Sequence, residues 1–188
     1  MNGETISHKN TSFFKNFAIE HFQHITTFVL DVDGVLTDGS LLLLPNGVQA
    51  RKMNIRDGYA LQLAIKRGYR IFILSGAVSE EVRDRLTRLG ITDIQMGIKD
   101  KGAALSAYLQ QHHIPASAVL YMGDDMPDLP ALRLAGTPCC PADAAPEIKQ
   151  LSVYISPLAG GAGCVRDVME KVLKLRGHWG EDPAVSSI

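Results

Sequence analysis

The chain has 188 residues, of which 46% are hydrophobic and 21% are charged, and its formal net charge is −1 at pH 7. This length supports one well-buried core, and the balanced charge argues against a nucleic-acid-binding face and against a polybasic membrane patch. The three cysteines, Cys139, Cys140 and Cys164, lack the spacing of a zinc site and predict reduced thiols in a cytoplasmic protein.

Three sections divide the chain. Residues 1–24 are polar, lack the apolar run of a signal peptide and are expected to form an N-terminal extension. Residues 25–176 are expected to form the single folded domain, and residues 177–188 a C-terminal tail. The apolar run 41–44 is far too short to span a bilayer, so no membrane segment is expected.

Short apolar runs alternate with helix-like segments from residue 28 onward. Strands are predicted at residues 28–30, 69–74, 94–96, 119–122 and 153–155, and helices at residues 57–67, 79–89, 101–112 and 127–135. This alternation predicts an α/β fold, a Rossmann-like parallel sheet with helices on both faces.

The first predicted strand ends in two aspartates, Asp31 and Asp33, which stand one residue apart. Open α/β sheets hold their ligands at the carboxyl ends of strands, where this strand would deliver both side chains. Two carboxylates this close repel each other unless a cation lies between them or one stays protonated. The pair favours a metal-assisted reaction in which one carboxylate attacks and the other moves protons; an aspartate-rich turn is the plain alternative.

Residues 40–55 interrupt the alternation and predict a β-hairpin, because Pro45, Asn46 and Gly47 form a strong turn signal between two strand-like runs. The hairpin follows the acid pair directly, so we expect it to project beside the site as a flap. Four consecutive leucines at 41–44 would leave an exposed apolar row, which indicates a covering surface, most simply another subunit. A hairpin folded on its own core is the alternative.

Two later positions suit a phosphate ligand. Ser75 and Gly76 end the second predicted strand, where a hydroxyl and a backbone N–H can cradle a phosphate oxygen, although a simple turn also explains them. Lys101 opens a predicted helix, where the macrodipole disfavours positive charge unless an anion lies in front. A solvated surface lysine is the alternative there, and Lys99 competes for the role.

Three aspartates, Asp124, Asp125 and Asp128, follow another apolar strand within five residues. Their proximity to Asp31 and Asp33 would be costly without a cation. A hard divalent ion with oxygen ligands resolves this, and Mg²⁺ suits a site made of a few carboxylates and a substrate phosphate. One of the three could instead cap a helix.

These ordered motifs together resemble the haloacid dehalogenase superfamily of phosphohydrolases, over about residues 26–176. The resemblance implies that Asp31 is the nucleophile that becomes a phosphoaspartate. Asp33 would protonate the leaving oxygen and then activate the hydrolytic water. Ser75 and Gly76 would bind the phosphoryl group, and Lys101 would balance the charge on nucleophile and phosphate.

The same resemblance implies a Mg²⁺ site. Asp124 would ligate the ion together with Asp31 and the backbone carbonyl of Asp33. Asp125 and Asp128 would be supporting acids around the metal.

The intervals between the motifs, 33–75 and 75–101, leave no room for a cap domain, so the enzyme is expected to be capless. An uncapped site must act on a large substrate or borrow its lid from a neighbouring subunit. Residues 33–39, 55–58 and 160–163, together with Arg166, look like the family of 3-deoxy-D-manno-octulosonate 8-phosphate (KDO 8-phosphate) phosphatases. This resemblance implies a homotetramer assembled through the hairpin flaps and a small sugar-acid phosphate as substrate, for the lipopolysaccharide of Gram-negative bacteria.

Recognition of the sugar acid is predicted at Arg56, whose planar guanidinium matches a carboxylate, with help from Lys52 or Arg51 on the flap. Ala77 departs from the family pattern, which often has arginine after the Ser-Gly pair. The nine-carbon 2-keto-3-deoxynononate 9-phosphate is therefore an alternative substrate, and the C-terminal tail could reach a neighbouring site.

Two further hypotheses remain open: an uncapped phosphatase for bulky phosphoesters, and a receiver-like signalling domain. The second fits poorly, because here the lysine precedes the Asp-Asp pair in the chain.

Overall fold

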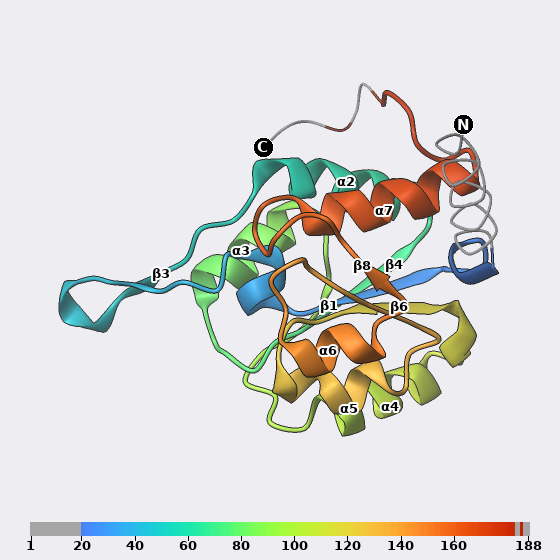
Figure 1. Ribbon diagram of the computed structural model, residues 1–188. Coiled ribbons are helices and arrows are strands. Elements are labelled where there is room, and N and C mark those ends of the chain that lie inside the picture. The colour runs from blue at the N-terminus through green and yellow to red at the C-terminus, as the bar shows by residue number, and fades with distance from the viewer. Residues whose placement is uncertain (1–19, 183–184, 186–188) are drawn as a thin grey trace, which may run out of the picture.

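The computed structural model describes residues 20–182 and residue 185. Within this part of the chain, six strands form one sheet in the order β5-β4-β1-β6-β7-β8, and every neighbouring pair is parallel. The strands are β1 (Thr27–Leu30), β4 (Arg70–Leu74), β5 (Asp93–Gln95), β6 (Val119–Met122), β7 (Thr137–Cys140) and β8 (Tyr154–Ile155). The sheet is the middle layer of the molecule (Figure 1).

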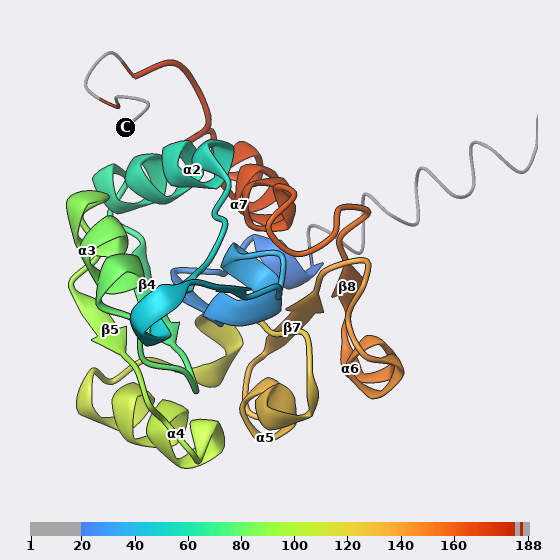
Figure 2. The same cartoon turned by 90° about the vertical axis from the view of Figure 1, so that its left-hand side faces the viewer.

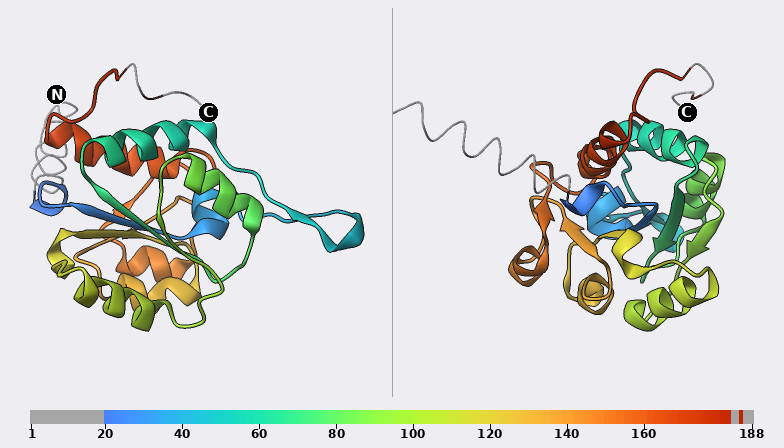
Figure 3. Two further views of the ribbon diagram at one scale, coloured as in Figure 1. Left: turned by 180° about the vertical axis from the view of Figure 1, so that it is seen from behind. Right: turned by 90° about the vertical axis from the view of Figure 1, so that its right-hand side faces the viewer.

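Helices cover both faces of this sheet (Figure 2 and Figure 3). They are α2 (Ile55–Lys66), α3 (Glu80–Arg88), α4 (Lys101–Gln111), α5 (Leu129–Leu132), α6 (Pro146–Leu151) and α7 (Cys164–Leu175). The first, second and last of these close one apolar core against the sheet, and α4, α5 and α6 close the other. The Rossmann-like α/β fold predicted from the sequence is confirmed.

Local chemistry sets where three of the helices begin. The side chains of Asn54, Ser79 and Asp100 each accept a backbone N–H from the first turn of α2, α3 and α4. Such caps satisfy amide donors that have no partner inside the helix. The cap at Asp100 fixes the position of Lys101, the first residue of α4.

The order of the strands brings three loops to one place. Strand β1 pairs with β4 on one side and with β6 on the other, so the carboxyl ends of these three strands lie next to one another. Asp31, Ser75 and Asp124 come just after these ends. All residues of β1 and β6 are buried, as expected for central parallel strands that are covered on both faces.

Several elements differ from the sequence prediction. Strand β7 was not predicted, because its sequence Thr-Pro-Cys-Cys resembles a turn more than a strand. Helices α6 and α7 were not predicted either. The helix predicted at 127–135 is a single 3₁₀ turn, Met126–Asp128, followed by the short α5, because Asp125 and Asp128 cap each other's backbone there.

The predicted flap is present as an antiparallel hairpin of β2 (Leu42–Leu43) and β3 (Gln49–Ala50) that projects from the body (Figure 1). Its stem closes where Thr37 bridges Met53. The side chains of Leu42 and Leu43 are 62% and 72% exposed, so the hairpin does not fold on a core of its own.

The core extends beyond the predicted domain of residues 25–176. Phe22 is buried in this core, and Trp179 packs against the core. Most of the predicted N-terminal extension, residues 1–19, and residues 183–184 and 186–188 of the tail lie outside the described residues. None of the helices in the described part of the chain is long and apolar enough to cross a membrane.

Candidate active site

The loops after β1, β4 and β6 surround a hollow of about 300 Å³ at the carboxyl edge of the sheet. All of the predicted catalytic and metal-binding residues line it, from four separate stretches of the chain. The lining residues are Asp31, Asp33, Gly39, Ser75, Gly76, Ala77, Lys101, Asp124, Asp125, Pro127 and Asp128.

Asp31 lies at the floor of this hollow. Its backbone N–H donates to the carbonyl of Met122, which extends the β1–β6 ladder by one residue and fixes the side chain at the strand end. The side chain is only 9% exposed, and Lys101 Nζ lies 2.9 Å from its Oδ1. Burial, and then the charge of Asp128, raise the pKa of Asp31 to about 7, although the ammonium of Lys101 opposes this.

Lys101 is held between two buried carboxylates. Its ammonium lies 2.9 Å from Asp31 and 2.6 Å from Oδ1 of Asp128, and its side chain is 3% exposed. Burial favours the neutral amine, but the charges of both aspartates outweigh it and raise the pKa of Lys101. The lysine is therefore a fixed positive charge beside Asp31 rather than a solvated surface residue.

Asp128 organises this pair from behind. Its Oδ1 accepts from Lys101 and from the buried hydroxyl of Tyr121, each at 2.6 Å. Its Oδ2 accepts the backbone N–H groups of Asp124 and Asp125 at 3.1 and 3.4 Å. With both oxygens occupied, Asp128 is placed to support the site rather than to lead as a metal ligand.

A metal ion fits between the acids. Carboxylate oxygens of Asp31, Asp124 and Asp128 all lie within 4.8 Å of one another. Burial and the neighbouring charge of Asp31 raise the pKa of Asp124 to about 7. Ionised carboxylates this close repel each other when no cation lies between them. An all-oxygen set of this kind suits Mg²⁺.

Glycines allow the loops to approach this closely. Gly34 has φ = +85°, and a Cβ there would lie 2.0 Å from Oδ2 of Asp124. Gly160, in the 160–163 segment that resembles the family pattern, packs on the same loop, where a Cβ would lie 2.0 Å from the carbonyl oxygen of Gly34. Both positions exclude any side chain.

Ser75 is 2% exposed, and its backbone N–H donates to the carbonyl of Gln95. Its Oγ accepts the N–H of Ala77 at 3.2 Å, so the hydroxyl and the loop form one small turn. Gly76 and Ala77 complete the wall beside it.

Asp33 lines the hollow from the flap side. The guanidinium of Arg51 forms a bidentate ion pair with it, with Nε 2.6 Å from Oδ1 and Nη2 3.2 Å from Oδ2. Sequence reasoning named Arg51 only as a possible substrate contact. Its pairing with an acid 18 positions away leaves no local signal in the sequence.

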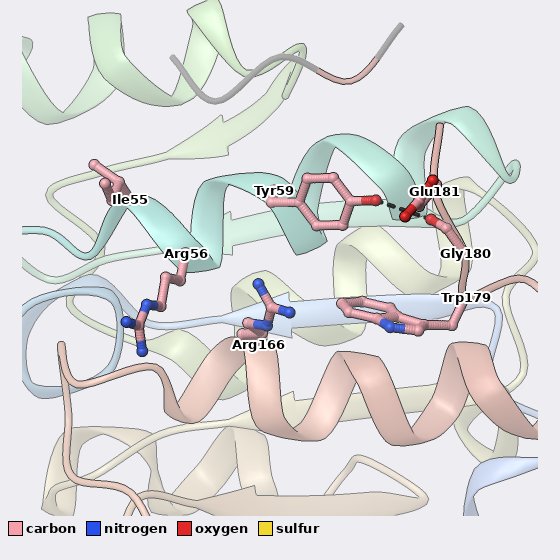
Figure 4. Close-up of a pocket in the computed structure, with 7 residues that line it drawn as sticks. All are labelled: Ile55, Arg56, Tyr59, Arg166, Trp179, Gly180 and Glu181. Carbon is pink, nitrogen blue, oxygen red and sulfur yellow. Dashed lines mark hydrogen bonds between the residues drawn. The ribbon is translucent and has the colours of Figure 1, made fainter. Parts of the chain in front are cut away.

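Arg56 and Lys52 do not line this hollow. Arg56 lies in a separate hollow of about 440 Å³ between α2, α7 and the chain after α7 (Figure 4). The guanidinium of Arg166 lies there over the rings of Trp179 and Tyr59, 5.2 and 5.8 Å from the ring centroids. Lys52 is exposed on the flap stem. Substrate binding by Arg56 and Lys52 stays a prediction.

Comparisons with known proteins point to one family. A model of haloacid dehalogenase-like hydrolases matches residues 90–165. The 3-deoxy-D-manno-octulosonate 8-phosphate phosphatase of Escherichia coli (strain K12) is 35% identical over 159 residues, which cover 85% of each chain.

Solved structures agree with this relationship. The phosphatase of that name from Moraxella catarrhalis, in complex with magnesium, phosphate and KDO, matches with a TM-score of 0.82 at 35% identity, over 85% of this chain and 91% of that chain. The cobalt-bound phosphatase from Haemophilus influenzae matches with a TM-score of 0.80 at 32% identity, over 84% and 92% of the two chains. The chain therefore belongs to the 3-deoxy-D-manno-octulosonate 8-phosphate phosphatase family of haloacid dehalogenase-like hydrolases.

Proposed function

We propose that this chain hydrolyses KDO 8-phosphate to KDO and inorganic phosphate through a phosphoaspartate on Asp31. Membership of the family makes it a Mg²⁺-dependent phosphoric monoester hydrolase. The observation that carries the residue assignment is the convergence of Asp31, Lys101 and Asp124 on one hollow from three separate stretches of the chain.

Asp31 attacks the phosphorus, and the bond between phosphorus and the sugar C8 oxygen breaks. The ammonium of Lys101, 2.9 Å from Oδ1 of Asp31, offsets the charge that gathers on nucleophile and phosphate. The hydroxyl of Ser75 and the N–H of Gly76 hold a phosphoryl oxygen. When bound by the carboxylates of Asp31 and Asp124 and the carbonyl of Asp33, Mg²⁺ supplies positive charge to the phosphoryl oxygens.

Asp33 moves the protons. It gives a proton to the departing C8 oxygen, so that the sugar leaves as an alcohol. It then takes a proton from the water that attacks the phosphoaspartate, which releases phosphate and restores Asp31. Asp33 is 35% exposed and lines the hollow, as this exchange requires.

We include a homotetramer joined by the flaps in this proposal. A row of exposed apolar side chains on the flap, including Leu42, Leu43 and Val48, supports it. A neighbouring copy would also supply the lid that a capless site lacks. Arg56, at the edge of a second hollow, and Lys52 on the flap would then serve the substrate carboxylate within the assembly.

A cytoplasmic location belongs to the same proposal. Cys139, Cys140 and Cys164 are all buried free thiols, which fits a reducing compartment.

The nine-carbon 2-keto-3-deoxynononate 9-phosphate is the second candidate substrate. Ala77 lines the hollow, so the position where many relatives have arginine faces the site and offers only a methyl group here. Because no charged side chain stands at this position, the site residues specify the reaction more firmly than the length of the sugar acid.

Phosphate release measured over eight- and nine-carbon keto-sugar phosphates, with hexose phosphates as controls, tests the assignment. We expect selective turnover of KDO 8-phosphate, its loss in EDTA and its loss in Asp31→Asn. Full turnover by Asp31→Asn would refute the phosphoaspartate, and preference for hexose phosphates would refute the substrate.

A further inference from the structure

We infer that Arg51, at the base of the flap, is a positioning residue that holds the carboxylate of Asp33 in the orientation for proton transfer. This inference rests on the role proposed for Asp33. It assigns to the flap a direct part in the chemistry, in addition to any part in assembly.

The geometry of the pair is specific. Nε and Nη2 of Arg51 face Oδ1 and Oδ2 of Asp33 at 2.6 and 3.2 Å, the paired arrangement that fixes both the plane and the direction of a carboxylate. The Arg51 side chain is only 5% exposed, although it belongs to a projecting hairpin. A guanidinium this well covered is held by its surroundings and does not sample the surface freely.

Arg51 approaches Asp33 from outside the catalytic hollow. Asp33 lines that hollow, whereas Arg51 lines a different one, between the flap base and the start of α3. Glu81 also lines the hollow at the flap base, yet the guanidinium of Arg51 pairs with Asp33. The position of Arg51 therefore suits support of Asp33 better than contact with the transferred phosphoryl group.

The remaining contacts show which oxygen is left for the proton. Oδ1 of Asp33 accepts from Arg51 Nε and, at 3.4 Å, from the hydroxyl of the buried Thr37. Among residues 20–182 and 185, Oδ2 accepts only from Arg51 Nη2. Because each carboxylate oxygen offers about two lone-pair sites, Oδ2 keeps one free. Oδ2 is therefore the atom with room for the proton that Asp33 carries when it acts as the acid, and for the proton that the ionised carboxylate later takes from water.

The backbone keeps Arg51 in place. Thr37, which contacts Asp33, also forms the bridge to Met53 that closes the flap stem. Arg51 lies directly after β3 and two residues before Met53, so β3 on one side and this bridge on the other hold the segment that carries it. A flap clamped by a neighbouring copy would hold Arg51 more firmly.

A double-mutant cycle between Arg51→Met and Asp33→Asn, with phosphate release as the readout, tests this inference. We expect Arg51→Met to lower kcat about 10- to 100-fold, part of the usual contribution of a positioned acid–base group, with KM changed less than about threefold. In the Asp33→Asn background the same substitution should change kcat less than about twofold, because Arg51 acts through Asp33. Arg51→Lys, which keeps the charge but loses the fork, should recover only part of the loss.

Arg70→Met is the matched control. Arg70 pairs with Asp93 through a single contact of 3.3 Å at the opposite edge of the sheet, so its removal deletes an equal charge and an Arg–Asp ion pair away from the hollow. We expect its kcat and KM to match the wild type. Thermal unfolding of each variant distinguishes a change in chemistry from a loss of folded protein.

Two results would overturn the inference. A rise in KM with kcat unchanged would make Arg51 a substrate contact. A kcat of the double mutant that falls by the product of the two single losses would show that Arg51 acts independently of Asp33. The cycle can be run with p-nitrophenyl phosphate as well, since water attack on the phosphoaspartate needs Asp33 with either ester. Failure of the proposed sugar substrate is thereby distinguished from failure of the role of Arg51.

Discussion

The hydroxyl of Tyr121 donates a 2.6 Å hydrogen bond to Oδ1 of Asp128, the same oxygen that accepts from Lys101. Both Tyr121 and Asp128 are buried, so no water replaces this donor. A buried carboxylate that loses a donor rearranges toward those that remain. Tyr121 thus helps to set where Lys101 places its charge beside Asp31.

We therefore predict that Tyr121→Phe lowers kcat about 10-fold, because a hydrogen bond to a charged group contributes about 1.5–3 kcal/mol and about 1.4 kcal/mol in the barrier is a factor of ten in rate. The free energy of unfolding should fall by about 1–3 kcal/mol. Steady-state kinetics and urea denaturation measure the two effects.

Tyr108→Phe is the control for this substitution, because Tyr108 also donates its hydroxyl to a carboxylate, that of Asp93, in a partly buried hydrogen bond away from the catalytic hollow. It should lose stability without losing turnover. Equal kcat in the two variants would contradict the positioning role of Tyr121.

The part of this site that could be predicted from sequence is the part that depends on strand ends. The prediction for residues 119–122 matched β6 at both ends, and a continuous apolar run followed by Gly-Asp-Asp explains why. Asp31, Ser75 and Asp124 could be placed together because parallel strands of such a sheet end at one edge.

Tyr121 and Arg51 could not be found in the same way. A tyrosine inside an apolar strand is typical of any core, and only the return of the chain at Asp128 gives its hydroxyl a function. Arg51 contacts Asp33 because the base of the hairpin lies against the segment after β1 that carries Asp33. Helix α7 was different: its apolar residues Val165, Val168, Met169 and Val172 have helical spacing, so its signal was present in the sequence.

Magnesium should stabilise this protein more strongly at high pH than at low pH. Without metal, burial raises the pKa of Asp31 and of Asp124 from 3.8 to about 7. A raised folded-state pKa gives stability that is fully present below the unfolded value and is lost as pH rises through 7. The metal-free protein is therefore less stable at about pH 8 than at about pH 5.5, where protons already neutralise the acids.

Because Mg²⁺ binds the ionised carboxylates, it competes with protons below pH 7 and meets free ligands above it. We expect the rise in Tm on adding Mg²⁺, compared with EDTA, to be larger at about pH 8 than at about pH 5.5. Differential scanning fluorimetry measures it, with Asp124→Asn as the variant that should lose the shift. A Mg²⁺ effect that is the same at both pH values would argue against these ligands.

We predict that Asp57 stabilises the first turn of helix α7, because the N-cap residue of α7 has no side chain to cap it. Helix α7 begins after Gly163, whose φ is +106° and which offers no side chain. Oδ1 of Asp57, from α2, accepts the N–H of Arg166 at 2.7 Å and so caps α7 from outside. Asp57→Ala should lower the free energy of unfolding by about 1–2 kcal/mol, measured by urea denaturation.

Asp57→Asn keeps the acceptor but not the charge, so it separates the cap from the ionisation. Burial raises the pKa of Asp57 to about 6, and its Oδ2 has no hydrogen-bond partner in the part of the chain that the structure describes. Asp57 should add to the loss of stability as pH rises from about 4 through 6, so Asp57→Asn should lose less than the wild type there, keeping only the part that comes from Asp31 and Asp124. Equal pH dependence in the two proteins would show that Asp57 does not titrate in this range.

The apolar row on the flap gives the last prediction. Leu42 and Leu43 are 62% and 72% exposed on a two-stranded hairpin, an arrangement that water disfavours and that a protein interface would cover. If the flaps join the subunits, replacing both leucines by glutamate buries charge at each contact and should reduce the assembly to a smaller species. Light scattering should give a tetramer for the wild type and a lower mass for Leu42→Glu/Leu43→Glu.

Leu134→Glu is the matched control for the flap variant, because Leu134 is also exposed, at 42%, but lies away from the flap. Its mass should equal that of the wild type. The flap variant should keep the thermal stability of its fold, since neither leucine belongs to the two cores, and should lose turnover only insofar as a neighbour completes the site. An unchanged mass would mean that the leucines face another partner, and the tetramer would have to be joined elsewhere.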